Sequence, residues 1–155
     1  MAKIAFEMIP LNPDIRDTIL AFGSGGIFIH CEIAFDNGMV GYCANKGRGV
    51  VLLNIADRDY NSGNWVIFDV PCSYSQEQTM LDYFIQRQGY SYNSIGVGAM
   101  LMGIPLNRSK SQFCSESCLG AMIEAKVIDT PFSPNLVSPN FLYQIVEKLN
   151  WKQHG

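Results

Sequence analysis

Two side chains of this sequence have the types that nucleophilic catalysis needs, the thiol of Cys114 and the imidazole of His30. Cys114 lies in the segment Ser-Gln-Phe-Cys-Ser-Glu, 111–116, at the predicted first turn of a helix. Unpaired N–H groups and the helix dipole favour an anion at such a position, so they lower the pKa of a thiol. The segment therefore favours a reactive thiolate, although most free cysteines are small buried hydrophobic residues.

His30 is one of only two histidines, and the other, His154, lies in a polar tail. Segment 27–35 is rich in β-branched and aromatic residues and predicts a strand around His30. The two-residue period of that strand places Phe28, His30 and Glu32 on one face and Ile29, Cys31 and Ile33 on the other. An imidazole and a carboxylate thus share a face, although a half-buried structural histidine fits the same pattern.

The elements that must position these residues begin with strands. Segments of strand composition fill most of the first half of the chain, at 3–9, 27–35, 39–44, 50–55 and 64–70. A short helix is expected at 14–21, and Asp36-Asn37-Gly38 is a strong turn signal that predicts a hairpin. We expect the strands to form an antiparallel meander.

The second half changes to a helical period. Ser75 and Gln78 form the pattern of a capping box for a helix that ends near Gly89. The next apolar segment, 92–102, contains glycines and fits a buried helix or a strand.

Two further helices complete the chain. One carries Cys114 and Cys118 on a single apolar stripe, and Ser138-Pro139 predicts the start of the other. Strands followed by helices predict one α+β domain over residues 1–155, with an antiparallel sheet packed against helices.

Composition limits the function and the compartment. With 11 basic and 14 acidic residues and a net charge of -3, the chain has no field that attracts phosphates, so we expect no nucleic-acid partner. The five cysteines form no C-x-x-C pair, which predicts neither a disulfide framework nor a metal site, and no cofactor motif is present. Free thiols and a start without a secretory signal predict the cytoplasm. The longest apolar run, 95–106, is too short for a transmembrane segment.

Four segments together resemble the circularly permuted NlpC-type branch of the papain-like cysteine hydrolases, in which the histidine precedes the cysteine. The first, Gly-Ile-Phe-Ile-His-Cys-Glu-Ile-Ala-Phe-Asp-Asn-Gly at 26–38, is similar to the strand motif S-H-V-E-[LIV]-x-F-x-D-G. The others are 47–50, Tyr92-Asn93-x-x-Gly96 and Phe113-Cys114-Ser115-Glu116, the last similar to F-C-S-E. The matched segments run from Ile27 to Glu116, and small stand-alone members of similar layout occur in bacteria and their viruses.

The resemblance implies a permuted papain-like fold and a cysteine hydrolase. Cys114 would attack an amide or ester carbonyl after His30 takes its proton, and a thioester intermediate would then be hydrolysed. The substrates implied are peptides, cell-wall peptides, isopeptides or lipid acyl groups. The enzyme would act as a thiol peptidase or amidase in the cytoplasm. For a viral protein this would be the cytoplasm of the host cell.

A third catalytic residue stays open at this stage. Many relatives place Glu, His or Gln on the next strand, where this sequence has Cys43, with Asn45 two residues later. Asn45 offers an amide to orient the imidazole. Glu32 shares the face of His30, but alternate residues of a strand stand roughly 6 to 7 Å apart. A Cys-His dyad without a third member is also workable.

Two other functions fit the same sequence. A lipid-directed thiol acyltransferase or lipase, as in the lecithin retinol acyltransferase relatives of this branch, would use the apolar segment 95–106 to face lipid. A binding module that keeps the fold without activity is the second alternative.

Overall fold

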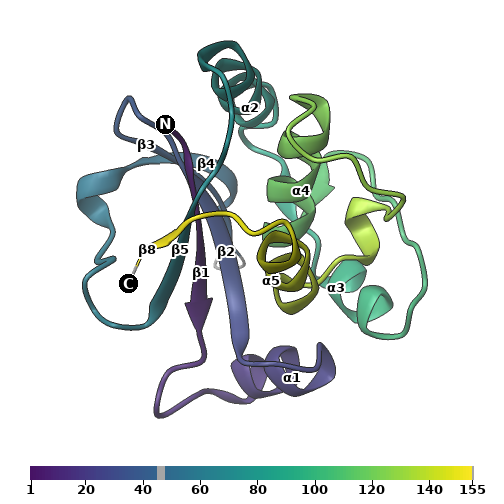
Figure 1. The fold of residues 1–155 in the computed structure, drawn as a ribbon. Helices are drawn as coiled ribbons and strands as arrows, with labels where there is room; N and C mark the ends of the chain where they lie inside the picture. The colour runs from purple at the N-terminus through teal and green to yellow at the C-terminus, as the bar shows by residue number, and fades with distance from the viewer. Residues whose placement is uncertain (45–47, 155) are drawn as a thin grey trace.

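A six-stranded antiparallel sheet with helices packed on one side forms the structure, a computed structural model that describes residues 1–44 and 48–154 (Figure 1). The strands are β1 Lys3–Met8, β2 Phe28–Ala34, β3 Met39–Ala44, β4 Gly49–Asn54, β5 Trp65–Asp69 and β8 Gln153–His154. Two short parallel strands, β6 Ser91–Tyr92 and β7 Ser111–Gln112, form a second sheet. The α+β class with an antiparallel sheet and helices is confirmed.

The order of the strands differs from the predicted meander. The sheet runs β4-β3-β2-β1-β5-β8, so β5 pairs with β1 instead of β4. β5 pairs with β1 because β1 is a central strand. Its Ile4 and Phe6 are fully buried, and it has a strand partner at each edge. Segment 55–64, which includes the 3-10 helix η1 Ile55–Asp57, carries the chain across the sheet to reach that edge.

The predicted hairpin is confirmed at the β2–β3 turn. Gly38 has φ +82°, a conformation that favours glycine, and the N–H of Phe35 donates to Met39 O at 2.8 Å. The side chain of Asn37 accepts from the N–H of Met39 at 3.0 Å. This turn fixes the register of the strand that carries His30.

Five α-helices occur among the described residues. They are α1 Ile15–Gly23, α2 Tyr74–Gln86, α3 Ser94–Leu101, α4 Cys114–Glu124 and α5 Pro139–Lys148, and the 3-10 helix η2 Pro134–Leu136 precedes the last. The segment 92–102 is thus a helix preceded by a short strand. The predicted start of α5 is confirmed, because the Ser138 hydroxyl accepts from Phe141 N–H at 3.1 Å.

The capping box of α2 was predicted two residues too late. Ser73, not Ser75, is the N-cap, and Gln76, not Gln78, completes the box. The Ser75 hydroxyl instead bonds to that of Ser73 at 3.0 Å. Both serines offer a hydroxyl, and the helix starts at the earlier one because the extended backbone of Ser73 lets its side chain reach the N–H of Gln76.

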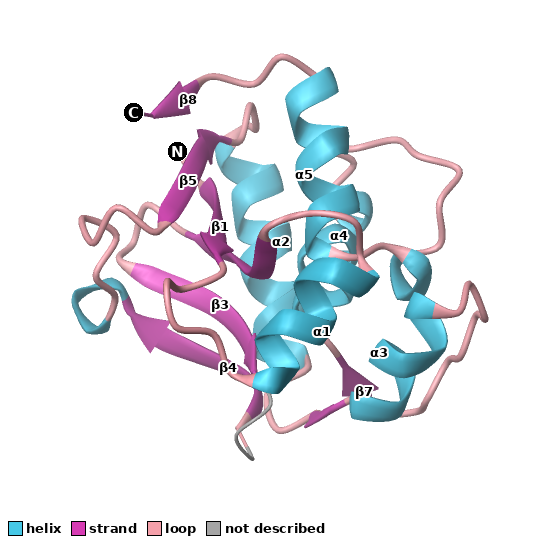
Figure 2. Cartoon of the chain, turned by 90° about the horizontal axis from the view of Figure 1, so that it is seen from below, coloured by secondary structure: helices cyan, strands magenta, loops and turns pink. Residues whose placement is uncertain are grey.

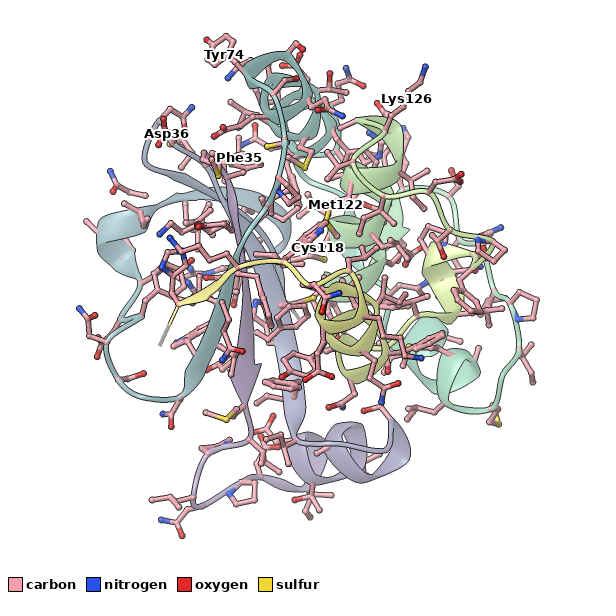
Figure 3. All side chains as sticks on the ribbon, viewed as in Figure 1. Phe35, Asp36, Tyr74, Cys118, Met122 and Lys126 are labelled. Atoms are coloured by element: carbon pink, nitrogen blue, oxygen red, sulfur yellow. The ribbon has the colours of Figure 1, made fainter. Side chains whose placement is uncertain are left out.

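The hydrophobic core lies between the sheet and the helices, and Figure 2 shows this separation of strands from helices. Cys118 and Met122 lie on the side of α4 that faces the sheet, whereas Tyr74 and Lys126 stand at the periphery (Figure 3). Burial of the cysteine stripe on α4 draws the start of that helix against β2 and β3. Among the described residues, no helix combines the length and the apolar character that crossing a bilayer requires.

Candidate functional site

A β-bulge in β2 places His30. Glu7 of β1 pairs with His30, but the next residue, Met8, pairs with Phe28, so Ile29 is an extra residue in β2. The prediction that Phe28 shares a face with His30 and Glu32 is therefore wrong. Phe28 joins Cys31 in the core instead, because the bulge shifts the alternation by one residue. His30 and Glu32 remain on the face opposite to that core.

The start of α4 lies against β2 and β3. Among the described residues these two strands pair at Ile33↔Gly41 and Ala34↔Val40. Helix α4 contacts both strands. The Cys43 thiol of β3 donates to the carbonyl of Gln112 at 3.3 Å, which ties β3 to the residues just before Cys114. Cys114 is the first residue of α4 and is only 5% exposed.

Cys114 meets two residues of β2 there. The Cys31 thiol and the His30 imidazole both hydrogen-bond to its sulfur, and these bonds, Cys31 first, hold the pKa of Cys114 well below the ordinary value of 9.0 against the opposing effect of burial. Burial lowers the pKa of His30, but the bonds with Cys114 and Glu32 outweigh it and raise that pKa well above 6.5. The two directions describe a thiolate facing an imidazolium.

Glu32 holds the other side of the imidazole. Nε2 of His30 and Oε2 of Glu32 are 3.2 Å apart, so the two side chains lean together although their Cα atoms are two residues apart on one strand. This contact leaves Nδ1 as the ring nitrogen free to face the thiol. Asn45, the other candidate for this position, lies outside the described residues. The Cys43 thiol bonds to the backbone of Gln112 instead. Among the described residues, no hydrogen bond joins Cys43 to the imidazole of His30.

Glu32 is fully buried and nonetheless ionised. Burial raises the pKa of a carboxyl, but hydrogen bonds from His30 and Arg58 outweigh this effect and lower the pKa of Glu32 to about 2. Arg58 Nε donates to Oε1 at 2.8 Å, a second guanidinium nitrogen reaches Oε2, and the Tyr60 hydroxyl donates to Oε1 at 2.6 Å. A buried carboxylate with this many donors is a fixed negative charge beside His30.

Aromatic rings surround the pair. Tyr42 of β3 and Trp65 of β5 meet the imidazole edge to face, with ring centroids at 5.0 and 6.3 Å. Tyr92, from the predicted Tyr92-Asn93-x-x-Gly96 segment, lies near Cys114, and burial together with that sulfur raises the pKa of its phenol. Its hydroxyl thus stays protonated beside the thiolate.

The N-cap residue of α4 supplies no side-chain cap. Phe113 is the N-cap and its side chain accepts no hydrogen bond. The carboxyl of Glu116 accepts from the N–H of Phe113 at 3.2 Å, and burial raises its pKa to about 7. Because the first-turn N–H groups of a helix have no partner within the helix, the start of α4 favours negative charge at Cys114.

Four residues of the site were not predicted from the sequence. The strand period placed Cys31 on the face opposite to His30 without a role, and nothing in segment 55–64 marked Arg58 or Tyr60. Asn140 of α5 is the fourth, and its amide bonds both backbone groups of Phe28, accepting from N–H at 2.8 Å and donating to O at 2.9 Å. It thereby takes the place of a strand partner next to the bulge. The site residues come from β2, β3, β5, the segment 55–64, α4 and α5, which no local motif could connect.

The described residues offer no group of three His, Cys, Asp or Glu side chains placed to hold a metal ion. The cysteines near Cys114 are protonated by burial instead, because the pKa values of Cys31 and Cys43 are raised. None of the five cysteines, all within the described residues, forms a disulfide.

Comparison with known proteins adds no relative to this geometry. No protein-family model matches the chain, and no curated protein sequence matches it.

Proposed function

We propose that this protein is a cysteine hydrolase of the permuted papain-like type, which cleaves an amide or ester bond. The observation that carries the proposal is the contact chain Cys114–His30–Glu32, in which a cysteine at a helix start meets an imidazole whose other nitrogen is held by a buried carboxylate. Cys114 is the nucleophile, His30 the general base and acid, and Glu32 the residue that orients His30.

The reaction follows from these roles. The Cys114 thiolate adds to the carbonyl carbon, and the oxyanion that forms accepts hydrogen bonds from first-turn N–H groups of α4. Collapse of this intermediate breaks the bond to the leaving group, which takes the proton of the His30 imidazolium. Neutral His30 then removes a proton from water, which attacks the thioester and releases the acid and the Cys114 thiolate.

A screen of substrate classes tests the proposal. The panel contains peptidoglycan-derived peptides, isopeptide-linked peptides, thioesters and phospholipids. We expect turnover of a peptide or isopeptide, its loss in Cys114→Ala, and its retention in Cys118→Ala, which removes a buried cysteine one turn later. Turnover that persists in Cys114→Ala would contradict the proposal.

A lipid-directed acyl hydrolase or transferase is the second candidate, and one observation favours it. Ile95 and Met102 of the α3 segment are 61% and 71% exposed, and Ile104 is 51% exposed, although all three are apolar. Exposed apolar side chains suit a lipid surface. Co-sedimentation with phosphatidylcholine vesicles separates this candidate, since a peptidase that works in solution stays in the supernatant.

A further inference from the structure

A cation lies behind the carboxylate that holds His30. The guanidinium of Arg58 forms a fork on Glu32, with Nε at 2.8 Å from Oε1 and a terminal nitrogen on Oε2. Oε2 is the same oxygen that faces Nε2 of His30 at 3.2 Å. Arg58 and His30 therefore share one carboxylate, and the position of that carboxylate depends on both.

Arg58 is itself held in one orientation. Its guanidinium carbon lies 4.7 Å from the ring centroid of Tyr42 and 5.3 Å from that of Trp65, the same two rings that flank His30. Its backbone N–H donates to Ile55 O at 3.0 Å and ends the helix η1. A planar cation between two aromatic rings keeps its donors in a fixed plane.

We propose that Arg58 is a positioning residue for the Cys114–His30 pair: it locks the Glu32 carboxylate against Nε2 of His30 and so keeps Nδ1 turned toward the thiol. The inference rests on the proposed function and adds a member that acts through Glu32 without touching substrate.

The energetics of burial support this role. A fully buried carboxylate needs compensating donors to stay ionised, and without Arg58 the partners of Glu32 among the described residues would be Tyr60 and His30. The carboxyl would then be protonated at a higher pH and would accept less strongly from the imidazole. With its acceptor weakened, the imidazolium of His30 is less stabilised and the Cys114 proton is harder to remove.

Other titratable groups also face this network. Glu7 of β1 lies opposite His30 in the strand pairing, and burial raises the pKa of its carboxyl. Tyr42 and Tyr60 approach from β3 and from the segment before β5, and Cys114 approaches from α4. Unlike these groups, Arg58 is a permanent cation, so its contribution does not change across the neutral range.

The test measures the pH dependence of Cys114 alkylation by iodoacetamide in four proteins: wild type, Arg58→Met, Glu32→Gln and the double variant. We expect Arg58→Met to raise the apparent pKa of Cys114 by about one unit, so the pH of half-maximal labelling moves up by the same amount. Glu32→Gln should act in the same direction. The double variant should be no slower than Glu32→Gln alone, because Arg58 acts through that carboxylate.

Controls separate positioning from folding. Arg87→Met removes an arginine that also stacks on a tyrosine, Tyr83, and also pairs with a glutamate, Glu124, and it should leave the Cys114 titration unchanged. Arg58→Lys keeps the charge without the fork and should recover part of the loss. If Arg58→Met fails to fold, Arg58→Lys and the double variant, in which no buried charge is left unpaired, carry the comparison.

Two results would overturn the inference. One is a lower melting temperature in Arg58→Met with an unmoved Cys114 titration, which indicates a structural role alone. The other is an additive effect in the double variant, which indicates that Arg58 does not act through Glu32. A wild-type Cys114 that titrates like an ordinary thiol would instead reject the proposed function itself, before any variant is compared.

Discussion

The starts of α2 and α4 differ in how the N–H groups of the first helical turn are bonded. The first turn of α2 is exposed, and Ser73 closes it: its hydroxyl accepts from the N–H of Gln76 at 3.3 Å while Gln76 accepts from the N–H of Ser73 at 3.0 Å. The first turn of α4 is buried, and its N-cap, Phe113, offers no acceptor. Only the second half of the box remains there, the bond from Phe113 N–H to Glu116.

The difference separates a helix start capped by a serine from a helix start to which the proposed function gives a catalytic role. A serine cap satisfies the first-turn N–H groups of α2 within the chain. In the proposed mechanism the same groups at α4 serve the Cys114 thiolate and an oxyanion formed beside it. Cys114 can exploit that position only because the bulge in β2 brings His30 and Cys31 to its sulfur.

The largest expected effect on Cys114 reactivity comes from removing His30, a partner that has no counterpart at the start of α2. In His30→Ala the thiol of Cys114 loses its cationic neighbour, and its pKa should rise toward 9.0. Alkylation at pH 6 should then fall by up to about 1000-fold, because each pKa unit is worth about tenfold in thiolate. His154→Ala is the matched control, since His154 pairs with Asp69 at the sheet edge. Equal labelling in the two variants would contradict a role for His30.

A second change makes the α4 box like that of α2. Glu116→Gln replaces a carboxyl whose pKa burial raises from 4.5 to about 7 by the residue type that α2 uses. The folded protein retains a proton that the unfolded chain releases, so stability is complete below pH 4.5 and falls as pH rises to about 7. Glutamine does not titrate, and the variant should be more stable above pH 7 by about 3 kcal/mol. Urea unfolding at pH 4.5 and pH 8 measures this, and an unchanged difference between the two pH values would argue against a protonated Glu116.

A third change weakens the thiolate without touching His30. Cys31→Ala removes the thiol that donates to the Cys114 sulfur, and the pH of half-maximal Cys114 labelling should rise by about one unit. Cys31→Ser keeps a donor at the same place and should restore most of the rate. The same rate in Cys31→Ala and wild type would show that this donor does not matter.

The smallest expected effect lies at the other helix. Ser73→Ala removes the cap of α2 and should lower the free energy of unfolding by about 1 kcal/mol. Because α2 starts far from the reactive sulfur along the chain and shares none of its partners, Cys114 alkylation should not change. A changed alkylation rate would mean that the two helix starts are coupled.

Local patterns predicted most elements of the fold. Asp36-Asn37-Gly38 set the hairpin, and Ser138-Pro139 set the start of α5. The position of β5 was not predictable from local sequence. A strand can pair with either of two neighbours, and the burial of side chains in the folded chain decides between them. The capping box of α2 was misplaced because two serines stand two residues apart and only the backbone selects between them.

The site was predictable only where its residues lie in local motifs. His30, Glu32 and Cys114 stand in short patterns whose residue types suggest chemistry, and the structure brings them into contact. The bulge at Ile29 leaves no sign in the sequence, because it depends on pairing with β1. Arg58 reaches Glu32 from a segment 26 residues away, and a long-range ion pair has no sequence period.

Alkylation of the folded wild-type protein across pH, followed by mass spectrometry, tests the central claim most directly. Cys72 is the internal reference, since it is more exposed than Cys114 while burial still raises its pKa. We expect Cys114 to be labelled first and to remain reactive at pH 6, and Cys72 to react appreciably only in alkaline solution. Labelling of Cys72 before Cys114, or a Cys114 rate that rises only near pH 9, would contradict a thiolate held by His30 at the start of α4.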